Sequence, residues 1–420
     1  MDIKTTILKN GLKIITANRP QTESVSLGFW VRTGSAYETK EENGISHFIE
    51  HMVFKGTKNR TSKQISEEIE NVGGQNNAYT SREVTAFYAK VLKNDIKTAL
   101  DVTSDLILAP TFPDDEMIKE KEVVVQEIKQ SIDTPDDIIF DYFQQEAFPN
   151  QALGRTILGP AESVRAMTAE MMFNYMHNHY AAENIVFVAV GNLNHDELAK
   201  MVEEKFFDFR AKTNFMVPEQ KYVGNVSITK KGIEQTHVML GFNGFNLGHE
   251  NHIAVQTLST LFGGGMSSRL FQEIREKRGL VYTIYSFSNA HSKAGTFGVY
   301  AGTTAEELNK LMPVLIDEIK KIQNDLVDEK ELKRAKSQLK AGMLMSLESS
   351  SVSAEMIARH HLMHGRFIPV EEIVEKIEAV TPEKIRSIAQ QIFNSNPNYT
   401  LLGNFEKYME YEKIKQDLKS

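Results

Sequence analysis

His47, Glu50 and His51 form the pattern H-x-x-E-H, whose residue types and spacing could hold and use a divalent metal ion. In an α-helix, residues three and four positions apart share a face, so both imidazoles would point at one ion with Glu50 beside them. The order inverts the H-E-x-x-H pattern and is itself a zinc-binding signature. The alternative is a pair of surface or core histidines without a metal. The pattern favours a zinc-dependent hydrolase.

A catalytic zinc ion needs a third protein ligand and a fourth position that is open to water. Glu127 is a candidate, because it lies in a segment that starts after a proline, carries acids in its first turn and ends before another proline, as a helix does. Glu120 precedes it by almost two helical turns, so both carboxylates would point the same way. One could bind the ion while the other orients a ligand. The alternative for Glu120 is a surface ion pair with Lys119 or Lys121.

Glu50 would be the general base of such a site. A zinc ion held by two neutral imidazoles and a carboxylate lowers the pKa of its water ligand to roughly 7 and polarises a carbonyl group. Glu50 lies next to the ligands in the sequence and reaches that water without binding the metal. General base catalysis is typically worth about 10²–10⁴-fold in rate. We therefore expect loss of Glu50 to reduce the rate and to leave the metal in place.

The stretch NGISHFIEHMVFKGT, residues 43–57, resembles the active-site helix of the pitrilysin-type inverted-zinc peptidases. Within that family it is most similar to bacterial relatives of the mitochondrial processing peptidase catalytic (beta) subunit. The resemblance places the distal zinc ligand on Glu127, 76 residues after His51, and a second acidic position on Glu120. It implies a zinc metalloendopeptidase with one zinc ion in each catalytic domain, bound by His47, His51 and Glu127.

A second motif, GGGMSSRLF at residues 263–271, is similar to one that the family carries in its second half. The resemblance implies that Arg275 and Tyr282 reach into the catalytic chamber. There, a guanidinium and a phenol could stabilise a developing oxyanion or hold the substrate backbone. The alternative is an arginine on a helix surface and a tyrosine in the core.

Residues 73–91 are expected to form a strand pair that binds the substrate. In the family, the strand matching residues 74–80 is an edge strand beside the zinc ion, and the peptide adds to it as a further strand. The glycines at its start would permit close backbone approach. A plain hairpin turn is the alternative. The resemblance implies that five residues contact the substrate, namely Gly74, Gln75, Asn77, Ala78 and Thr80.

The composition fits this interpretation. The chain has 420 residues, 25% of them charged, and a net charge of −8, which argues against a nucleic-acid partner. This charge would suit peptides that contain Lys or Arg, although the acidic residues near position 136 are better explained as a solvated helix end. Because cysteine is absent, the zinc ligands must be nitrogen or oxygen atoms.

The amino-terminal stretch reads as an amphipathic strand and turn rather than as a signal peptide. No apolar run approaches the roughly 20 residues that a membrane span requires. We therefore expect a cytoplasmic protein without a membrane span.

The order of predicted elements occurs twice along the chain, which indicates a duplication. We predict a catalytic domain at residues 1–212, a linker at 213–225 and a second homologous domain at 226–420, which contributes Arg275, Tyr282 and the chamber wall. In the second copy, residues 252–256 read His-Ile-Ala-Val-Gln where the ligands should be, so only the first copy can bind the metal.

Strands and helices are gathered into an α+β pattern, in which each domain has an antiparallel or mixed sheet with helices packed mainly on one side. The resemblance implies that two such chains close around a chamber, as a homodimer or as a heterodimer with an inactive homologue. Whether Arg275 and Tyr282 then act on their own subunit or on the partner is left open.

The sequence thus predicts a zinc endopeptidase that hydrolyses short unfolded or presequence-like peptides inside an enclosed chamber. The main alternative is a non-catalytic peptide-binding or scaffolding subunit of the same fold. A purely structural zinc site would need four protein ligands, and only three candidates converge. The physiological substrate and the cleavage preference do not follow from the sequence.

Overall fold

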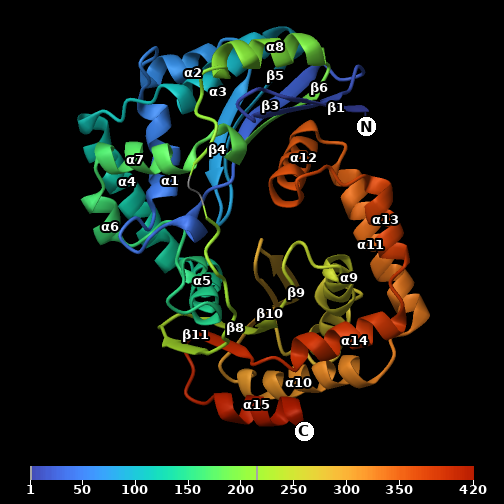
Figure 1. Cartoon of the computed structure of the whole chain (residues 1–420). Helices are drawn as coiled ribbons and strands as arrows, with labels where there is room; N and C mark the ends of the chain where they lie inside the picture. The colour runs from blue at the N-terminus through green and yellow to red at the C-terminus, as the bar shows by residue number, and fades with distance from the viewer. Residues whose placement is uncertain (1, 214–215) are drawn as a thin grey trace. The chain divides into compact units, whose positions relative to one another are not determined.

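Two β-sheets, each covered by helices, organise the chain in the computed structural model (Figure 1), as the predicted α+β class requires. The structure describes residues 2–213 and 216–420. The chain divides into two compact units. The first consists of residues 1–129, 155–218 and 346–367, and the second of residues 130–154, 219–345 and 368–420.

The first unit is built on a six-stranded mixed sheet with the order β1-β2-β6-β3-β5-β4. Strands β2 and β6 are parallel, and all other neighbours are antiparallel. Strand β4 is the last strand on one side, so only one of its edges is paired, with β5. The strands are β1 Asp2–Ile7, β2 Lys13–Asn18, β3 Ser24–Val31, β4 Gln75–Thr80, β5 Thr85–Leu92 and β6 Ile185–Gly191.

Side chains alternate between the two faces of this sheet, and both faces are apolar. On β3, Leu27 and Phe29 belong to the main core, whereas Trp30 belongs to a second core on the opposite face. Most helices of the unit cover the first face, and α12 covers the second (Figure 1). The helices are α1 Ile45–Met52, α2 Ser62–Glu70, α3 Ile96–Leu108, α4 Asp114–Asp133, α6 Ala161–Ala166, α7 Ala169–His179, α8 His195–Phe206 and α12 Ser350–His364.

The second sheet has five strands in the order β7-β11-β8-β10-β9. This order repeats β2-β6-β3-β5-β4 of the first sheet strand for strand, including the one parallel pair, here β7 and β11. The repeated topology supports the predicted duplication, with β1 as an addition to the first copy. The strands are β7 Val226–Lys230, β8 Thr236–Asn243, β9 Thr283–Ala290, β10 Gly295–Thr303 and β11 Asn398–Gly403.

Helices of the second unit also cover both faces of their sheet. Most pack on one face, and α5 packs on the other through Ile139 and Phe143. Residues Phe271–Glu276 form a short π-helix. The α-helices are α5 Pro135–Ala147, α9 His252–Gly263, α10 Leu308–Asn324, α11 Glu329–Ser346, α13 Val370–Glu378, α14 Pro382–Phe393 and α15 Tyr411–Lys419.

Helices α5 and α12 explain why the compact units differ from a simple division of the chain at the predicted linker. Residues 130–154, with α5, belong to the second unit, and residues 346–367, with α12, belong to the first. Each helix covers a sheet face that would otherwise be bare and apolar. Within the predicted linker, residues 214 and 215 lie outside the described residues.

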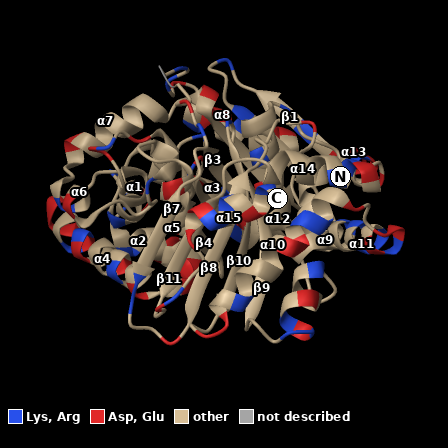
Figure 2. Ribbon diagram, turned by 90° about the horizontal axis from the view of Figure 1, so that it is seen from below, with Lys and Arg blue, Asp and Glu red and all other residues tan. Residues whose placement is uncertain are grey.

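Charged residues of both signs are distributed along the helices, as Figure 2 shows for α4. Among residues 2–213 and 216–420, no helix is both long and apolar enough to span a bilayer.

Candidate metal centre

Helix α1 is fixed at its amino terminus by a buried carboxylate. The Glu38 side chain accepts hydrogen bonds from the backbone N–H of Gly44 at 2.8 Å and of Ser46 at 3.0 Å, and from the Asn43 amide at 3.0 Å. A carboxylate suits this position, because the first N–H groups of a helix lack partners and carry positive partial charge. Gly44 has φ 96°, and a Cβ there would lie 2.5 Å from the Leu158 carbonyl oxygen, so glycine is required.

The apolar face of α1 packs into the main core and orients the opposite face. Phe48, Ile49 and Met52 are fully buried, and each contributes roughly 1.5–3 kcal/mol through burial. A helix of eight residues is not stable by propensity alone, so this packing holds it in place. His47 and His51 remain on the partly exposed face, as the sequence pattern predicts.

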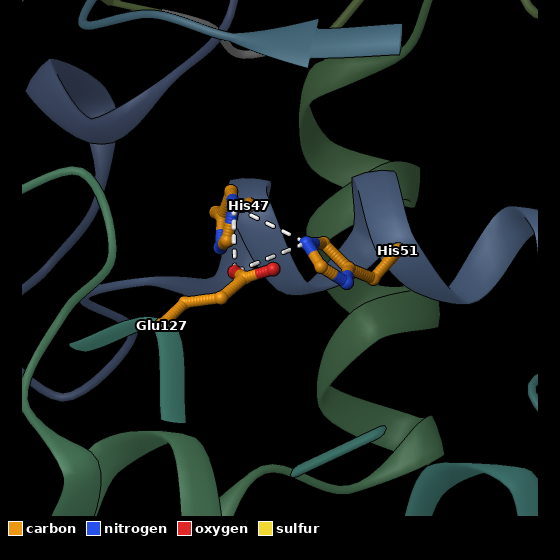
Figure 3. Close-up of side chains that lie close together, drawn as sticks. All are labelled: His47, His51 and Glu127. Atoms are coloured by element: carbon orange, nitrogen blue, oxygen red, sulfur yellow. Dashed lines mark hydrogen bonds and ion pairs between the residues drawn. The ribbon is translucent and has the colours of Figure 1, made fainter. Parts of the chain in front are cut away.

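Three ligand atoms converge beside α1 (Figure 3). Nε2 of His47 lies 3.3 Å from Nε2 of His51, and Oε2 of Glu127 lies 3.7 Å and 3.5 Å from these two nitrogens. Glu127 comes from α4, so two separate helices supply the set. Among the described residues, this is the one group of three or more His, Cys, Asp or Glu side chains that could hold a metal ion.

These spacings fit a tetrahedral zinc ion. Ligand atoms at about 2.0–2.2 Å from a tetrahedral centre lie roughly 3.3–3.6 Å from one another. The observed triangle has sides of 3.3, 3.5 and 3.7 Å, and it presents two imidazole nitrogens and one carboxylate oxygen. Three protein ligands leave a fourth position for water or substrate, which is the arrangement of catalytic rather than structural zinc sites.

Glu120 orients one of the ligands instead of pairing with its neighbours in the sequence. Its Oε1 lies 2.8 Å from Nδ1 of His51, and its Oε2 lies 2.6 Å from Nζ of Lys55. Lys119 pairs with Glu116 instead. With a proton on Nδ1 donated to Glu120, the lone pair of Nε2 of His51 is directed at the metal position.

Lys55 is a residue of the site that the sequence reasoning missed. Lys55 follows His51 by four residues, about one helical turn, and this spacing could have indicated that the two side chains lie close together.

The electrostatics of the site favour a neutral His47 and a basic Glu50. Burial, reinforced by the neighbouring His51, lowers the pKa of His47 to about 3, so this imidazole is neutral at pH 7, as a metal ligand must be. Burial raises the pKa of Glu50 above its ordinary value, against hydrogen bonding by Thr80, which lowers it. Within the described part of the chain, Nδ1 of His47 and Oε2 of Glu50 are buried without hydrogen-bond partners. The free Oε2 of Glu50 can therefore accept a proton.

Strand β4 passes beside α1 and presents an unpaired backbone edge. The Thr80 hydroxyl donates a hydrogen bond to the Ser46 carbonyl of α1 at 3.3 Å. The Ala78 N–H donates to Oδ1 of Asn77 at 2.9 Å, so it points away from β5. Since backbone groups alternate along an antiparallel strand, those of Ala78 and Thr80 face the open edge. No other strand of the described residues occupies this edge.

The remaining predicted substrate residues differ in position. The side chains of Gln75 and Asn77 are exposed on β4. Gly74 precedes the strand, and a Cβ there would lie 2.7 Å from Cγ1 of Val91 and 3.0 Å from Cγ2 of Ile69. Close packing onto the core thus accounts for this glycine without a ligand.

Arg275 and Tyr282 lie in the second unit and are not among the residues that converge around His47 and His51. Arg275 is exposed in the π-helix, with its guanidinium carbon 4.6 Å from the centroid of the Phe271 ring. Tyr282 is 59% exposed, immediately before β9. The alternative of a core tyrosine is therefore wrong, whereas a role in catalysis stays a prediction.

Comparison with known proteins agrees with this geometry. Residues 13–161 match the family model described as Insulinase (Peptidase family M16), and residues 166–339 match the model described as Peptidase M16 inactive domain. All three candidate ligands fall within the first match. Helix α9, the counterpart of α1 in the second half, carries His252 and Gln256 at the positions of the two histidines.

Full-length relatives carry the name of zinc protease. An uncharacterized zinc protease of Rickettsia felis is 40% identical over 401 residues, covering 94% of this chain and 96% of that protein. The uncharacterized zinc protease YmxG of Bacillus subtilis is 38% identical, covering 96% of this chain and 98% of that protein.

Solved structures show the same fold at lower identity. A protease from Helicobacter pylori superposes with a TM-score of 0.88 at 22% identity, covering 96% of this chain and 99% of that one. A peptidase M16 inactive domain from Pseudomonas fluorescens gives 0.89 at 19% identity, covering 98% and 100%. The extent of the sequence matches confirms the resemblance to the pitrilysin-type peptidases: the chain belongs to peptidase family M16.

Proposed function

We propose that the protein is a zinc-dependent endopeptidase that hydrolyses short unfolded or presequence-like peptides. The observation that carries the proposal is the convergence of His47, His51 and Glu127, with spacings that suit one zinc ion and a position left for water. The names of the relatives from Rickettsia felis and Bacillus subtilis support zinc as the metal. Entry of the peptide into an enclosed chamber stays a prediction.

The chemistry divides between the metal and Glu50. Zinc, when bound, supplies a Lewis acid that acidifies a water molecule and polarises the scissile carbonyl group. Glu50 takes the proton of the attacking water through its free Oε2 and can return it to the leaving amine. Its raised pKa brings it closer to the operating pH, which favours both proton transfers. Glu120 and Lys55 keep His51 in the tautomer that directs Nε2 inward.

Substrate binding at β4 explains why peptides are the proposed substrate class. An extended peptide can pair with the backbone groups of Ala78 and Thr80 as an added strand. It would displace the Asn77 side chain from the Ala78 N–H. Because Thr80 also contacts α1, this pairing sets the peptide bond beside the metal centre. Backbone pairing reads little side-chain information, so we expect broad specificity and a requirement for an extended substrate.

The alternative of a non-catalytic subunit is less well supported. The inactive-domain model matches residues 166–339, which contain none of the three ligands. All three ligands and Glu50 lie in the segment that matches the insulinase model. A scaffold that had lost catalysis would not need the pairing of His51 with Glu120 and of Glu120 with Lys55.

Metal removal tests the proposal directly. Treatment with a chelator should abolish cleavage of an unstructured fluorogenic peptide, and stoichiometric zinc should restore it, because the ligands are preformed at zinc spacings. The measurement is initial rate together with zinc content by elemental analysis. Magnesium serves as a control, since it prefers six oxygen ligands. Full activity in the zinc-free protein would refute the metallopeptidase assignment.

We also propose that the protein works as a dimer, either of identical chains or with an inactive homologue, and that Arg275 and Tyr282 serve the partner's metal centre. Their exposure leaves both side chains available for such contact. Mixing inactive Glu50→Gln chains with inactive Tyr282→Phe chains should then restore up to about a quarter of the activity, since one site of a mixed dimer is intact. Activity of the mixture and its mass by light scattering are the measurements. A dimeric mixture without recovery would show that Tyr282 does not act in trans.

A further inference from the structure

A single carboxylate on α12 joins that helix to two strands of the first sheet. Oε2 of Glu355 accepts a hydrogen bond from the Trp30 indole N–H at 2.6 Å, and Oε1 accepts one from the Tyr79 hydroxyl at 2.5 Å. Trp30 belongs to the inner strand β3, whereas Tyr79 belongs to the edge strand β4. Arg359, one turn further along α12, lies 3.7 Å from the same carboxylate.

The Tyr79 contact completes a two-sided attachment of β4. Tyr79 stands between Ala78 and Thr80 and points to the opposite face of the sheet. Thr80 is tied to α1 on one face through the Ser46 carbonyl, and Tyr79 is tied to α12 on the other through Glu355. An edge strand is paired along one side only, so it depends on such contacts more than an inner strand does.

The contact is well suited to hold the strand. Burial, together with the charge of Glu355, raises the pKa of the Tyr79 hydroxyl, which therefore stays protonated and donates. Hydrogen bonds to a charged acceptor are shorter and stronger than neutral ones. The indole of Trp30, which is 3% exposed, anchors the other carboxylate oxygen to the centre of the sheet. Glu355 thus fixes β4 relative to β3 as well as to α12.

We propose that Glu355 is a positioning residue that, through Tyr79, holds β4 in the geometry required to pair with a substrate strand. The inference rests on the proposed peptidase function and deepens it, because it assigns substrate alignment to a residue 305 positions after Glu50. Glu355 contacts none of the three candidate ligands, so its removal should weaken peptide binding and leave the metal in place.

Two variants test the contact between Tyr79 and Glu355, which we call the clamp. Each removes one partner without a large change in side-chain shape. Tyr79→Phe deletes only the hydroxyl, and Glu355→Gln leaves one acceptor oxygen for two donors. We expect each to raise KM for an unstructured peptide about three- to tenfold, with kcat changed less than about twofold and zinc content unaltered. The double variant should raise KM no more than the single variant with the larger effect, because both substitutions remove the same contact.

Ser351→Ala is the matched control. It removes the hydrogen bond between the hydroxyls of Ser351 on α12 and Ser26 on the inner strand β3, 2.9 Å apart, and does not affect a contact to β4. Its KM should equal that of the wild type. Hydrogen exchange adds a structural readout, in which the amides of residues 75–80 should exchange faster in the two clamp variants than in Ser351→Ala.

The outcomes separate this inference from the proposed function. Affinity for a labelled peptide, measured in a Glu50→Gln background, should fall by the same factor as KM rises and requires no turnover. If the wild type cleaves and the variants keep its KM and exchange pattern, the clamp is refuted and the peptidase function stands. A wild type that neither cleaves nor binds any peptide would overturn both.

Discussion

Glu50→Gln abolishes peptide hydrolysis and leaves zinc bound: this is the expected result with the largest effect on rate. The amide keeps the shape of the side chain but cannot take a proton from the attacking water. Since general base catalysis contributes about 10²–10⁴-fold, kcat should fall by at least that factor. Glu50 is not among the candidate ligands, which are His47, His51 and Glu127, so zinc content should match the wild type. Single-turnover kinetics and elemental analysis on the same sample measure both quantities.

Glu122→Gln is the control for this experiment. Glu122 is an exposed carboxylate on α4 that lies 3.4 Å from Arg165 and is not among the candidate metal ligands, so its conversion should change neither rate nor metal content. A Glu50→Gln protein that cleaves at the wild-type rate would remove Glu50 as the base. Loss of zinc from that protein would instead assign Glu50 a role in metal binding.

Glu127→Gln should lose the metal and, with it, the activity. An amide oxygen is a much weaker zinc ligand than a carboxylate, and the remaining two imidazoles cannot hold the ion alone. Zinc affinity should fall by more than about 100-fold, because even outer partners of zinc ligands account for roughly 10–100-fold. Competition with a chromogenic chelator gives the affinity, and activity should return only at high zinc concentration.

Glu120→Gln calibrates that measurement. Glu120 contacts His51 through Nδ1 and does not reach the metal position, so its loss should weaken zinc binding less than the loss of Glu127, by about 10–100-fold. The reverse order of the two effects would mean that Glu120 is the ligand and that the assignment of the two carboxylates is inverted.

The two candidate histidine ligands could be predicted from the sequence because helical periodicity is local. His47 and His51 share a face at a spacing that any α-helix imposes. The partners of the two α4 carboxylates were harder to predict. The sequence indicates that Glu120 and Glu127 point the same way, but it does not indicate which helix they contact. The resemblance to a known family assigned Glu127, and the interatomic distances now agree with it.

Contacts between distant segments could not be predicted, because no local pattern records them. Glu38 precedes α1 by several residues and has no sequence signature as its cap, yet it accepts three hydrogen bonds there. The assignment of α12 to the first sheet depends on complementary apolar surfaces, to which Trp30 and Ile357 contribute. The order of strands in each sheet could not be predicted from the sequence either, although the duplication could be predicted from the repeated order of elements.

The placement of α12 has a consequence for biosynthesis. The six strands of the first sheet are synthesised long before residues 346–367. Trp30 and Val188, on one face of that sheet, therefore stay uncovered until α12 has been synthesised. During that interval the nascent protein exposes an apolar surface to which chaperones can bind and through which it can aggregate. The hydrogen bond from Tyr79 to Glu355 can therefore form only after residues 346–367 have been synthesised.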